Sequence, residues 1–224
     1  MALHVADTGR LSLRHLALTD AAFILELVND PDWLRNIGDR DLPVCDRDRR
    51  GPAAVSSDLK IRAARPADFG AILALNEASV AVLSPLSPRR LADLHAKAAL
   101  HRVAELDGEV TGFLLAFREG ADYDSPNYRW FAARYPMFLY VDRVVVSQAA
   151  RGSGIGALLY RDLFSFAASS AVDLVTCEFD VDPPNPASER FHARFGFHEV
   201  GRQWLDDGRK QVSLQAASVQ KETR

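Results

Sequence analysis

A glycine-rich segment, RGSGIG at residues 151–156, is the feature that most constrains the fold of this chain. It follows an apolar run at 138–146 and precedes a run at 157–167 in which apolar residues recur at helical spacing. Glycine adopts backbone conformations that other residues avoid and leaves its amide groups accessible to a ligand. Free amides that open a helix bind anions, because the helix dipole favours negative charge there. The segment therefore predicts a phosphate-binding loop between a strand and a helix.

Two known phosphate-binding patterns can be compared with this segment. A nucleoside-triphosphate P-loop needs Lys and then Ser or Thr directly after its last glycine, whereas Ala and Leu follow Gly156, so that class is excluded. A dinucleotide-binding fingerprint fits better, since Gly152, Gly154 and Ala157 have its spacing and Asp173 follows about one helix later. That fold places its first glycine almost at the end of the strand, but here the segment SQAAR intervenes. Dinucleotide binding stays open as an alternative.

The composition limits which classes of protein, and which kinds of binding partner, fit this chain. The 224 residues are enough to bury a core, and 48% hydrophobic with 25% charged residues is ordinary for a globular chain. A net charge of -3 gives no general attraction to nucleic acid. Cys45 and Cys177 form no metal or redox spacing, and no apolar run has the length of a membrane span. We expect a cytoplasmic protein with no metal site and no nucleic-acid or membrane partner.

The first part of the chain reads as an extension joined by a linker. A strand at 11–16 is followed by a helix that Thr19 and Asp20 introduce and that stops by Pro31. The residues that follow are charged and then rich in Pro, Gly, Ala and Ser, as in an exposed linker. Strand, acidic cap and apolar helix recur from residue 59, as in a partial internal repeat. The expected parts are an extension at 1–38, a linker at 39–57, a domain at 58–217 and a flexible tail at 218–224.

The pattern within 58–217 predicts alternating helices and hairpins. Helices are expected at 67–82 and 88–100, and Asp107-Gly108 predicts a tight turn between two strands. The polar and aromatic stretch at 118–136 is long for a loop, which makes it either a substrate rim or a surface excursion fastened by Trp130 and Phe131. A closing hairpin is expected at 198–217.

Two motifs in this order resemble one known family. Arg151-x-x-Gly154-x-Gly156 after a valine-rich strand is similar to the R/Q-x-x-G-x-G/A signature of the GNAT superfamily of acyl-CoA-dependent N-acetyltransferases. A strand at 174–181 follows, and then NPASERFH at 185–192 and Phe-Gly-Phe, which resemble the family's N-x-x-A-x-x-F-Y-x-x-x-G-F segment. Ser188 stands in place of Ala, and His192 stands in place of Tyr.

The resemblance implies a fold and an activity. The fold is α/β (α+β): a central mixed, mostly antiparallel sheet that splays at the acyl-CoA slot, with flanking helices and here a short N-terminal strand–helix extension. The activity is direct transfer of an acetyl group from acetyl-CoA to a primary amine of an unidentified substrate. A catalytically inactive CoA-binding or interaction module and a dinucleotide-binding protein are the alternatives. Members of the family are often homodimers, so a homodimer is possible here.

The resemblance also implies where the donor binds. The loop amides would hold the pyrophosphate of coenzyme A, and the exposed edge of the valine-rich strand would pair with the pantetheine arm. Arg151 would add positive charge, unless it is simply a solvated surface arginine, and Asn185 would contact the arm, cap the following helix, or do both. The predicted cofactor-binding residues are Val144, Val145, Val146, Arg151, Gly152, Ser153, Gly154, Ile155, Gly156, Ala157, Asn185 and Ser188.

Catalysis needs a base for the ammonium form of the amine and an acid for the departing thiolate. His192 stands where many family members carry a Tyr acid, and it either donates that proton or only packs its helix against the core. Glu178 matches a position at which some members carry the base. Asp142 is the second candidate, because alternation along its strand puts it on the same face as Val144 and Val146. Either acid could instead be an ion-pair partner of Arg143 or of another arginine.

Overall fold

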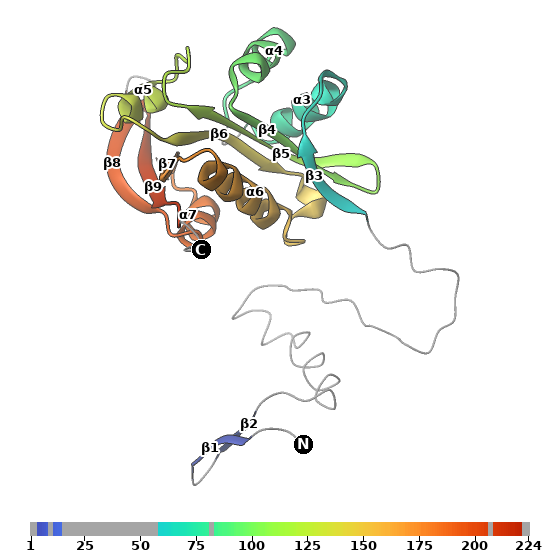
Figure 1. Ribbon diagram of the computed structural model, residues 1–224, viewed down its shortest axis with the longest axis vertical. Helices are drawn as coiled ribbons and strands as arrows, with labels where there is room; N and C mark the ends of the chain where they lie inside the picture. The colour runs from blue at the N-terminus through green and yellow to red at the C-terminus, as the bar shows by residue number, and fades with distance from the viewer. Residues whose placement is uncertain (1–3, 9–10, 15–57, 81–82, 206–207, 221–224) are drawn as a thin grey trace. The chain divides into compact units, whose positions relative to one another are not determined.

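The chain divides into two compact units, Met1–Val55 and Ser56–Arg224, which are described here one at a time. A computed structural model gives the structure (Figure 1). The residues that it describes are 4–8, 11–14, 58–80, 83–205 and 208–220.

The first unit contains a two-stranded antiparallel sheet of β1 (His4–Thr8) and β2 (Leu11–Arg14). Strand β2 covers most of the strand expected at 11–16, and β1 is an addition that the sequence pattern did not predict. The helix expected after Thr19, the linker at 39–57 and Cys45 lie outside the described residues. The proposed internal repeat therefore stays a prediction.

The second unit is built on a seven-stranded sheet with the order β3-β4-β5-β6-β7-β9-β8. Every neighbouring pair is antiparallel except β6 and β7, which confirms a mixed, mostly antiparallel sheet. Dinucleotide binding requires a doubly wound parallel sheet, so this topology argues against that alternative. The strands are β3 (Leu59–Ala63), β4 (Leu100–Leu106), β5 (Glu109–Arg118), β6 (Leu139–Val146), β7 (Leu174–Asp182), β8 (His198–Leu205) and β9 (Lys210–Ser218).

Both expected hairpins are present. Strands β4 and β5 turn at Asp107 and Gly108, which both have positive φ, as the Asp-Gly pair predicts. Strands β8 and β9 pair across the turn that precedes Lys210. Strand β9 runs to Ser218, and Val219 is buried in the core, so packed structure extends past residue 217.

The helices begin at residues that favour helix starts. Ser87, Ser125 and Asn185 each accept a hydrogen bond from the backbone three residues on, and a proline follows each of them. The helices are α3 (Phe69–Glu77), which follows a short 3-10 turn η2 (Pro66–Asp68), α4 (Pro88–Lys97), α5 (Pro126–Ala132), α6 (Ile155–Ser169), preceded by η3 (Gln148–Ala150), and α7 (Pro186–Ala193). Helix α3 ends five residues before the expected position, and the expected loop at 118–136 contains α5.

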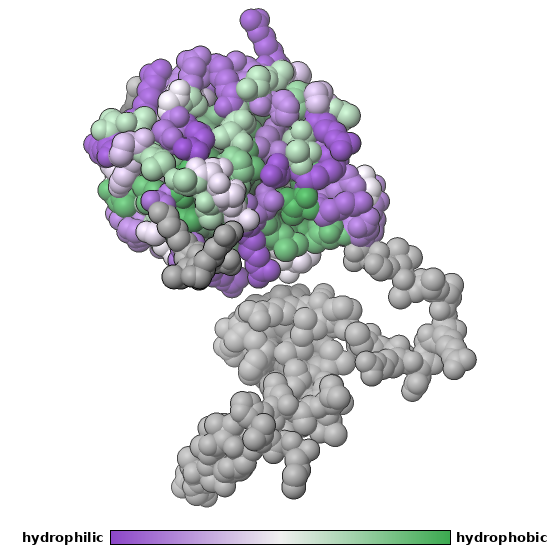
Figure 2. Space-filling view, viewed as in Figure 1, coloured by the Kyte–Doolittle hydropathy of each residue, from purple (hydrophilic) through white to green (hydrophobic). Residues whose placement is uncertain are grey.

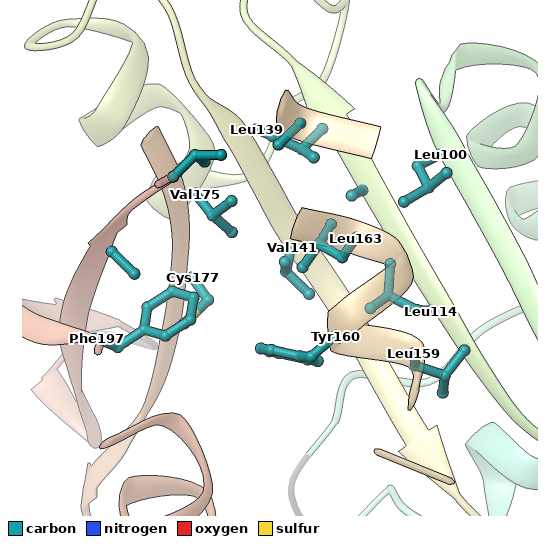
Figure 3. Close-up of a cluster of buried hydrophobic side chains, with 14 of the residues drawn as sticks. Leu100, Leu114, Leu139, Val141, Leu159, Tyr160, Leu163, Val175, Cys177 and Phe197 are labelled. Atoms are coloured by element: carbon teal, nitrogen blue, oxygen red, sulfur yellow. The ribbon is translucent and has the colours of Figure 1, made fainter. Parts of the chain in front are cut away.

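The core lies on both faces of the sheet. On one face, α6 packs Leu159, Tyr160 and Leu163 against side chains of β6 and β7, as Figure 3 shows. On the other face lie α3, α4 and α5, and the aromatic residues Phe117, Tyr128 and Phe131 are buried there. Each fully buried side chain of this size contributes about 1.5–3 kcal/mol of transfer free energy.

The surface of this unit is mixed. Figure 2 shows hydrophilic and hydrophobic residues interspersed on the face that it presents. Among the described residues, no helix is both long and apolar enough to cross a membrane. Within the same residues, no group of His, Cys, Asp and Glu side chains has an arrangement that could hold a metal ion.

Candidate active site

Strands β6 and β7 separate after only two paired positions. Leu139 pairs with Val175 and Tyr140 pairs with Thr176, and beyond them β6 continues beside β5 while β7 continues beside β9. Figure 1 shows β7, β9 and β8 turning away from β6. We call the place beyond these two pairs the splay. From residue 141 on, the β7-facing edge of β6 has no strand partner among the described residues, so its backbone groups can pair with an extended ligand.

The loop at the end of β6 opens α6 with exposed backbone. Gly152 and Gly154 have φ of 84° and 86°, a left-handed conformation that favours glycine. Gly154 is the N-cap of α6, and no side chain caps the helix in the described structure. The first amides of α6 are therefore free to bind an anion, with the helix dipole adding to the attraction.

Gly156 has a different reason to be glycine. A Cβ atom built there would lie 3.2 Å from the Phe191 ring, so this glycine allows α7 to approach the first turn of α6. Around Gly152 and Gly154, by contrast, a Cβ would meet open space among the described residues. The first two glycines thus shape the backbone of the loop, and the third serves the packing of two helices.

The other residues predicted to bind acetyl-CoA differ in their burial and in their contacts. Ile155 is buried in the core and Ser153 donates a hydrogen bond from Oγ to the Ala150 carbonyl at 2.6 Å. Val146 and Arg151 line a cavity of about 410 Å³ between this segment and α3. Arg151 is exposed, and Ala157 follows directly in the first turn of α6. None of these observations assigns them to a ligand, so their roles stay proposals.

A β-bulge in β6 corrects one prediction about Asp142. Leu115 pairs with Arg143 whereas Ala116 pairs with Val141, so Asp142 is the extra residue of the bulge. Beyond the bulge, Val144 and Val146 pack against the α6 side of the sheet and Val145 packs against the other side. Asp142 itself contacts Tyr123 and Arg143, on the side of α3 and α5. The expectation that it shares a face with Val144 and Val146 is therefore wrong, because simple alternation does not pass through a bulge.

The bulge brings Asp142 close to Glu178. The Tyr140 hydroxyl donates to Glu178 Oε1 at 3.0 Å, and the Tyr123 hydroxyl donates to Asp142. Glu178 Oε2 is buried and accepts no hydrogen bond of standard geometry from the described residues, although the Asn127 side-chain amide lies near enough to lower the pKa of Glu178. Both candidate bases thus lie at the splay, two residues beyond the last β6–β7 pair on their respective strands.

The pKa values of Glu178 and Asp142 are both raised, mainly because the two carboxyl groups are buried. Burial, and then the charge of Asp142, raise the pKa of Glu178 to about 8. Burial also raises the pKa of Asp142, although the Arg143 guanidinium, 3.2 Å from the carboxylate, opposes that rise. A carboxyl group with a pKa near neutrality can take up a proton and release it at physiological pH.

His192 lies on the opposite side of the sheet, and both of its ring nitrogens have hydrogen-bond partners. Its Nδ1 lies 2.8 Å from the Ser188 carbonyl oxygen, which can only accept, so Nδ1 carries the proton. Its Nε2 therefore accepts from the Tyr160 hydroxyl at 2.7 Å. The ring stacks on Phe179 and is buried, and burial lowers its pKa. This geometry favours the packing alternative, because an acid role would require one of these hydrogen bonds to break.

Asn185 and Ser188 serve α7 in this structure. The Asn185 side-chain oxygen accepts from the Ser188 amide at 3.1 Å, as expected of a helix cap. The Ser188 hydroxyl lies 3.2 Å from His192 Nδ1. The alternative in which Asn185 both caps and contacts a ligand stays open, because its amide nitrogen is not used in the cap.

Sequence reasoning missed several residues that complete the site. Tyr140 lies two residues before Asp142, and Tyr123 falls in the stretch that was expected to form a substrate rim. Arg143 donates to Asn76 at 2.6 Å and to the Ser84 carbonyl at 2.7 Å, which ties the segment after α3 to β6. A tyrosine near two candidate acids was a usable signal for Tyr140. Arg143 was named as a possible ion-pair partner of either acid, and its contact with Asp142 at 3.2 Å confirms that alternative for Asp142. The contacts of Tyr123, and those of Arg143 with Asn76 and Ser84, had no local signal.

Comparison with known proteins gives one family and one fold. A model of the acetyltransferase (GNAT) family matches residues 71–197. A phosphinothricin N-acetyltransferase of Streptomyces coelicolor is 48% identical over 67 residues, which are 30% of this chain and 37% of that protein, so the match spans well under half of this relative.

Solved structures with the same fold are more distant in sequence. The ribosomal-protein-S18-alanine N-acetyltransferase of Escherichia coli has 14% identity and a TM-score of 0.57 over 75% of this chain and 97% of its own. Ard1 of Thermoplasma volcanium has 17% identity and a TM-score of 0.60 over 73% and 99%. A putative acetyltransferase of Salmonella typhimurium, yncA, solved with its cofactor acetyl-CoA, has 20% identity and a TM-score of 0.57 over 75% and 98%.

Proposed function

The chain belongs to the GNAT acetyltransferase family, and on that premise we propose that it transfers an acetyl group from acetyl-CoA directly to a primary amine. The observation that carries the proposal is the splay, where an unpaired edge of β6 and a buried, incompletely hydrogen-bonded Glu178 lie together. The edge can hold an extended donor, and the carboxyl can accept a proton from the acceptor.

The donor site comprises the loop and the free edge of β6. The amides from Gly152 to Gly156 would hold the pyrophosphate, and the backbone of Val144–Val146 would pair with the pantetheine amides. The residues fit this group because the two left-handed glycines expose the N-terminus of α6 and no described side chain occupies it. When bound, acetyl-CoA supplies an activated acetyl thioester.

Glu178 acts as the base in this proposal. The acceptor amine is mostly ammonium at neutral pH and must lose a proton before its nitrogen can attack. As the new N–C bond forms and the C–S bond breaks, the nitrogen loses a second proton and the sulfur gains one, so one proton is released overall. Asp142 supports this role, because its negative charge raises the pKa of Glu178 and so makes Glu178 a stronger base.

The acid for the departing sulfur is assigned differently from the family pattern. Both ring nitrogens of His192 are already hydrogen-bonded, to Ser188 and Tyr160, so we propose that His192 positions α7 against α6. Glu178, once protonated, carries a proton at the splay that it can donate again. The same carboxyl would then serve as base and acid in successive steps.

Release of free thiol from acetyl-CoA in the presence of a panel of primary amines tests the proposal. We expect amine-dependent thiol release by the full-length chain, with acetylated amine identified by mass spectrometry. Glu178→Gln should lose it, whereas Glu109→Gln, an exposed glutamate at the start of β5, should keep it. Binding of acetyl-CoA without thiol release across the panel would instead support the inactive CoA-binding module. Homodimer formation stays a prediction, which sedimentation of the purified chain checks.

A further inference from the structure

The charges around the splay bear on which amine the site accepts. Building on the proposed function, we infer that the acceptor is a primary alkyl or arylalkyl amine that carries no acidic group. The inference uses three features of the described residues: the cations near the two acids, the surplus of carboxyl groups, and the aromatic side chains beside them.

The cations that act most strongly on the two acids are already paired. The largest positive charges that lower the pKa values of Asp142 and Glu178 belong to Arg90, Arg143 and Lys210. Arg90 pairs with Asp93 and Asp124, and Lys210 pairs with Asp180 at 2.9 Å. Arg143 pairs with Asp142 and also donates to two oxygen atoms of the α3–α4 segment. An incoming carboxylate or phosphate would therefore have to displace an existing partner.

Carboxyl groups outnumber these cations. Lys97, which pairs with Asp93 and Asp122, adds a fourth cation, and six acids stand against these four cations: Asp93, Asp122, Asp124, Asp142, Glu178 and Asp180. Glu178 Oε2 is buried and accepts no hydrogen bond of standard geometry from the described residues, and neither does Oγ1 of Thr176, two residues earlier on the same face of β7. Unpaired buried oxygen atoms are costly unless a donor reaches them. An ammonium group brings both positive charge and N–H donors, and an acidic group brings neither.

Aromatic rings form the rest of the surroundings. Tyr123, whose hydroxyl donates to Asp142, stacks on Phe117 with ring centroids 4.4 Å apart. Tyr140, whose hydroxyl donates to Glu178, lies edge-on to Tyr128, with centroids 5.7 Å apart. Phe117, Tyr128 and Tyr140 are at most 3% exposed, so these rings surround the two acids with apolar side chains and bring few further donors. An acidic group of the acceptor would therefore find few hydrogen-bond donors among these side chains.

Matched pairs of acceptors give the test, with the full-length chain and acetyl-CoA. The pairs are tyramine with tyrosine, phenethylamine with phenylalanine, and cadaverine with lysine, each differing by one carboxylate. Like charges brought together at a binding site strongly disfavour that partner. We therefore expect kcat/KM to be at least about tenfold higher for the amine of each pair. Phosphinothricin, which carries two acidic groups beside its amine, should be a poor acceptor.

Methyl esters of the same amino acids separate charge from size. An ester has the bulk of the carboxylate without its charge, so we expect it to be acetylated more nearly like the amine. Equal rates for amine and amino acid, or rejection of the ester together with the acid, would overturn the inference. So would the absence of thiol release with every acceptor, and calorimetry with acetyl-CoA would then show whether the proposed function fails as well.

Discussion

Each side of the sheet at the splay holds a candidate catalytic residue, and the two residues differ in how fully they are hydrogen-bonded. On the α6 side, His192 and Tyr160 are buried, and both ring nitrogens of the histidine have hydrogen-bond partners. On the α5 side, next to a second carboxyl, one oxygen of Glu178 accepts a hydrogen bond and the other accepts none of standard geometry from the described residues. A satisfied buried group is stable as it stands, whereas an unsatisfied one gains when a ligand arrives. The difference supports the proposal that the chemistry lies on the α5 side, although the sequence pattern predicted candidate residues on both.

Replacing Glu178 should have the largest effect. Glu178→Gln keeps an oxygen for the Tyr140 hydroxyl but removes the base, so kcat/KM should fall by about 10²–10⁴-fold. Steady-state thiol release measures it. A thermal melt of the same sample shows that the variant is folded, and activity within about threefold of wild type would remove Glu178 from the mechanism.

His101 tests whether an unpaired buried atom is enough to mark a catalytic group. Its Nε2 also has no partner in the described residues, but it lies on β4, beside His95 and Phe113 and not at the splay. Burial, and then the charge of His95, lower its pKa from 6.5 to about 4. Between pH 6.5 and pH 4 the His101 ring is protonated in the unfolded chain but neutral in the folded one. The free energy of unfolding is therefore highest above pH 6.5, and it falls as the pH drops to 4.

The measurement is denaturant unfolding of wild type and His101→Phe as a function of pH. The stability of wild type relative to the variant should fall by about 3 kcal/mol from the top to the bottom of that window. Activity at neutral pH should be unchanged. His198→Phe, at an exposed histidine of β8, is the matched control for the same substitution away from the core. A loss of activity in His101→Phe would contradict the account, because it would show that a residue away from the splay is also needed for catalysis.

The pH dependence of the rate should report the coupling of the two acids. Glu178 must be deprotonated to act as a base, so kcat/KM should fall about tenfold per pH unit below its pKa of about 8. Asp142→Asn removes a charge that raises this pKa, and the limb should move to lower pH. The acceptor amine titrates equally with both enzymes, so the shift between the two profiles isolates Glu178. Superimposable profiles would contradict the coupling.

The Tyr160–His192 pair should matter for stability by a smaller amount. Tyr160→Phe and His192→Phe each leave one buried partner unpaired, at a cost of about 1–3 kcal/mol. The double variant removes both, so its loss should be less than the sum by about 1 kcal/mol. Denaturant unfolding measures this cycle. A fall of about a hundredfold in kcat/KM for His192→Phe, with the fold intact, would assign the acid role to His192 after all.

Much of the fold could be predicted from local patterns. The RGSGIG segment, the Asp-Gly turn and the Asn185-Pro186 cap each specify a local conformation through their own backbone or side chain, and the structure has a loop, a hairpin and a helix there. Helix α5 was missed because its seven residues are too few for a periodic pattern, and aromatic burial stabilises it instead.

The candidate site was less predictable, for a different reason. Glu178 and Asp142 were identified from their places on two strands, but the bulge that turns Asp142 toward Tyr123 depends on how β5 and β6 pair. No local pattern in β6 marks that extra residue. The hydrogen bond that His192 accepts was equally hidden, since its donor is Tyr160, 32 residues away in the chain.

Calorimetric titration of acetyl-CoA into the full-length chain tests the central claim most directly. Gly154→Val places a side chain at the N-terminus of α6, and Gly108→Val introduces similar left-handed strain in the β4–β5 turn, away from the loop. We predict saturable binding with a Kd at or below about 100 µM for wild type and Gly108→Val, weakened at least about tenfold in Gly154→Val. No saturable binding by wild type up to about 1 mM, or equal affinity in all three, would contradict the account.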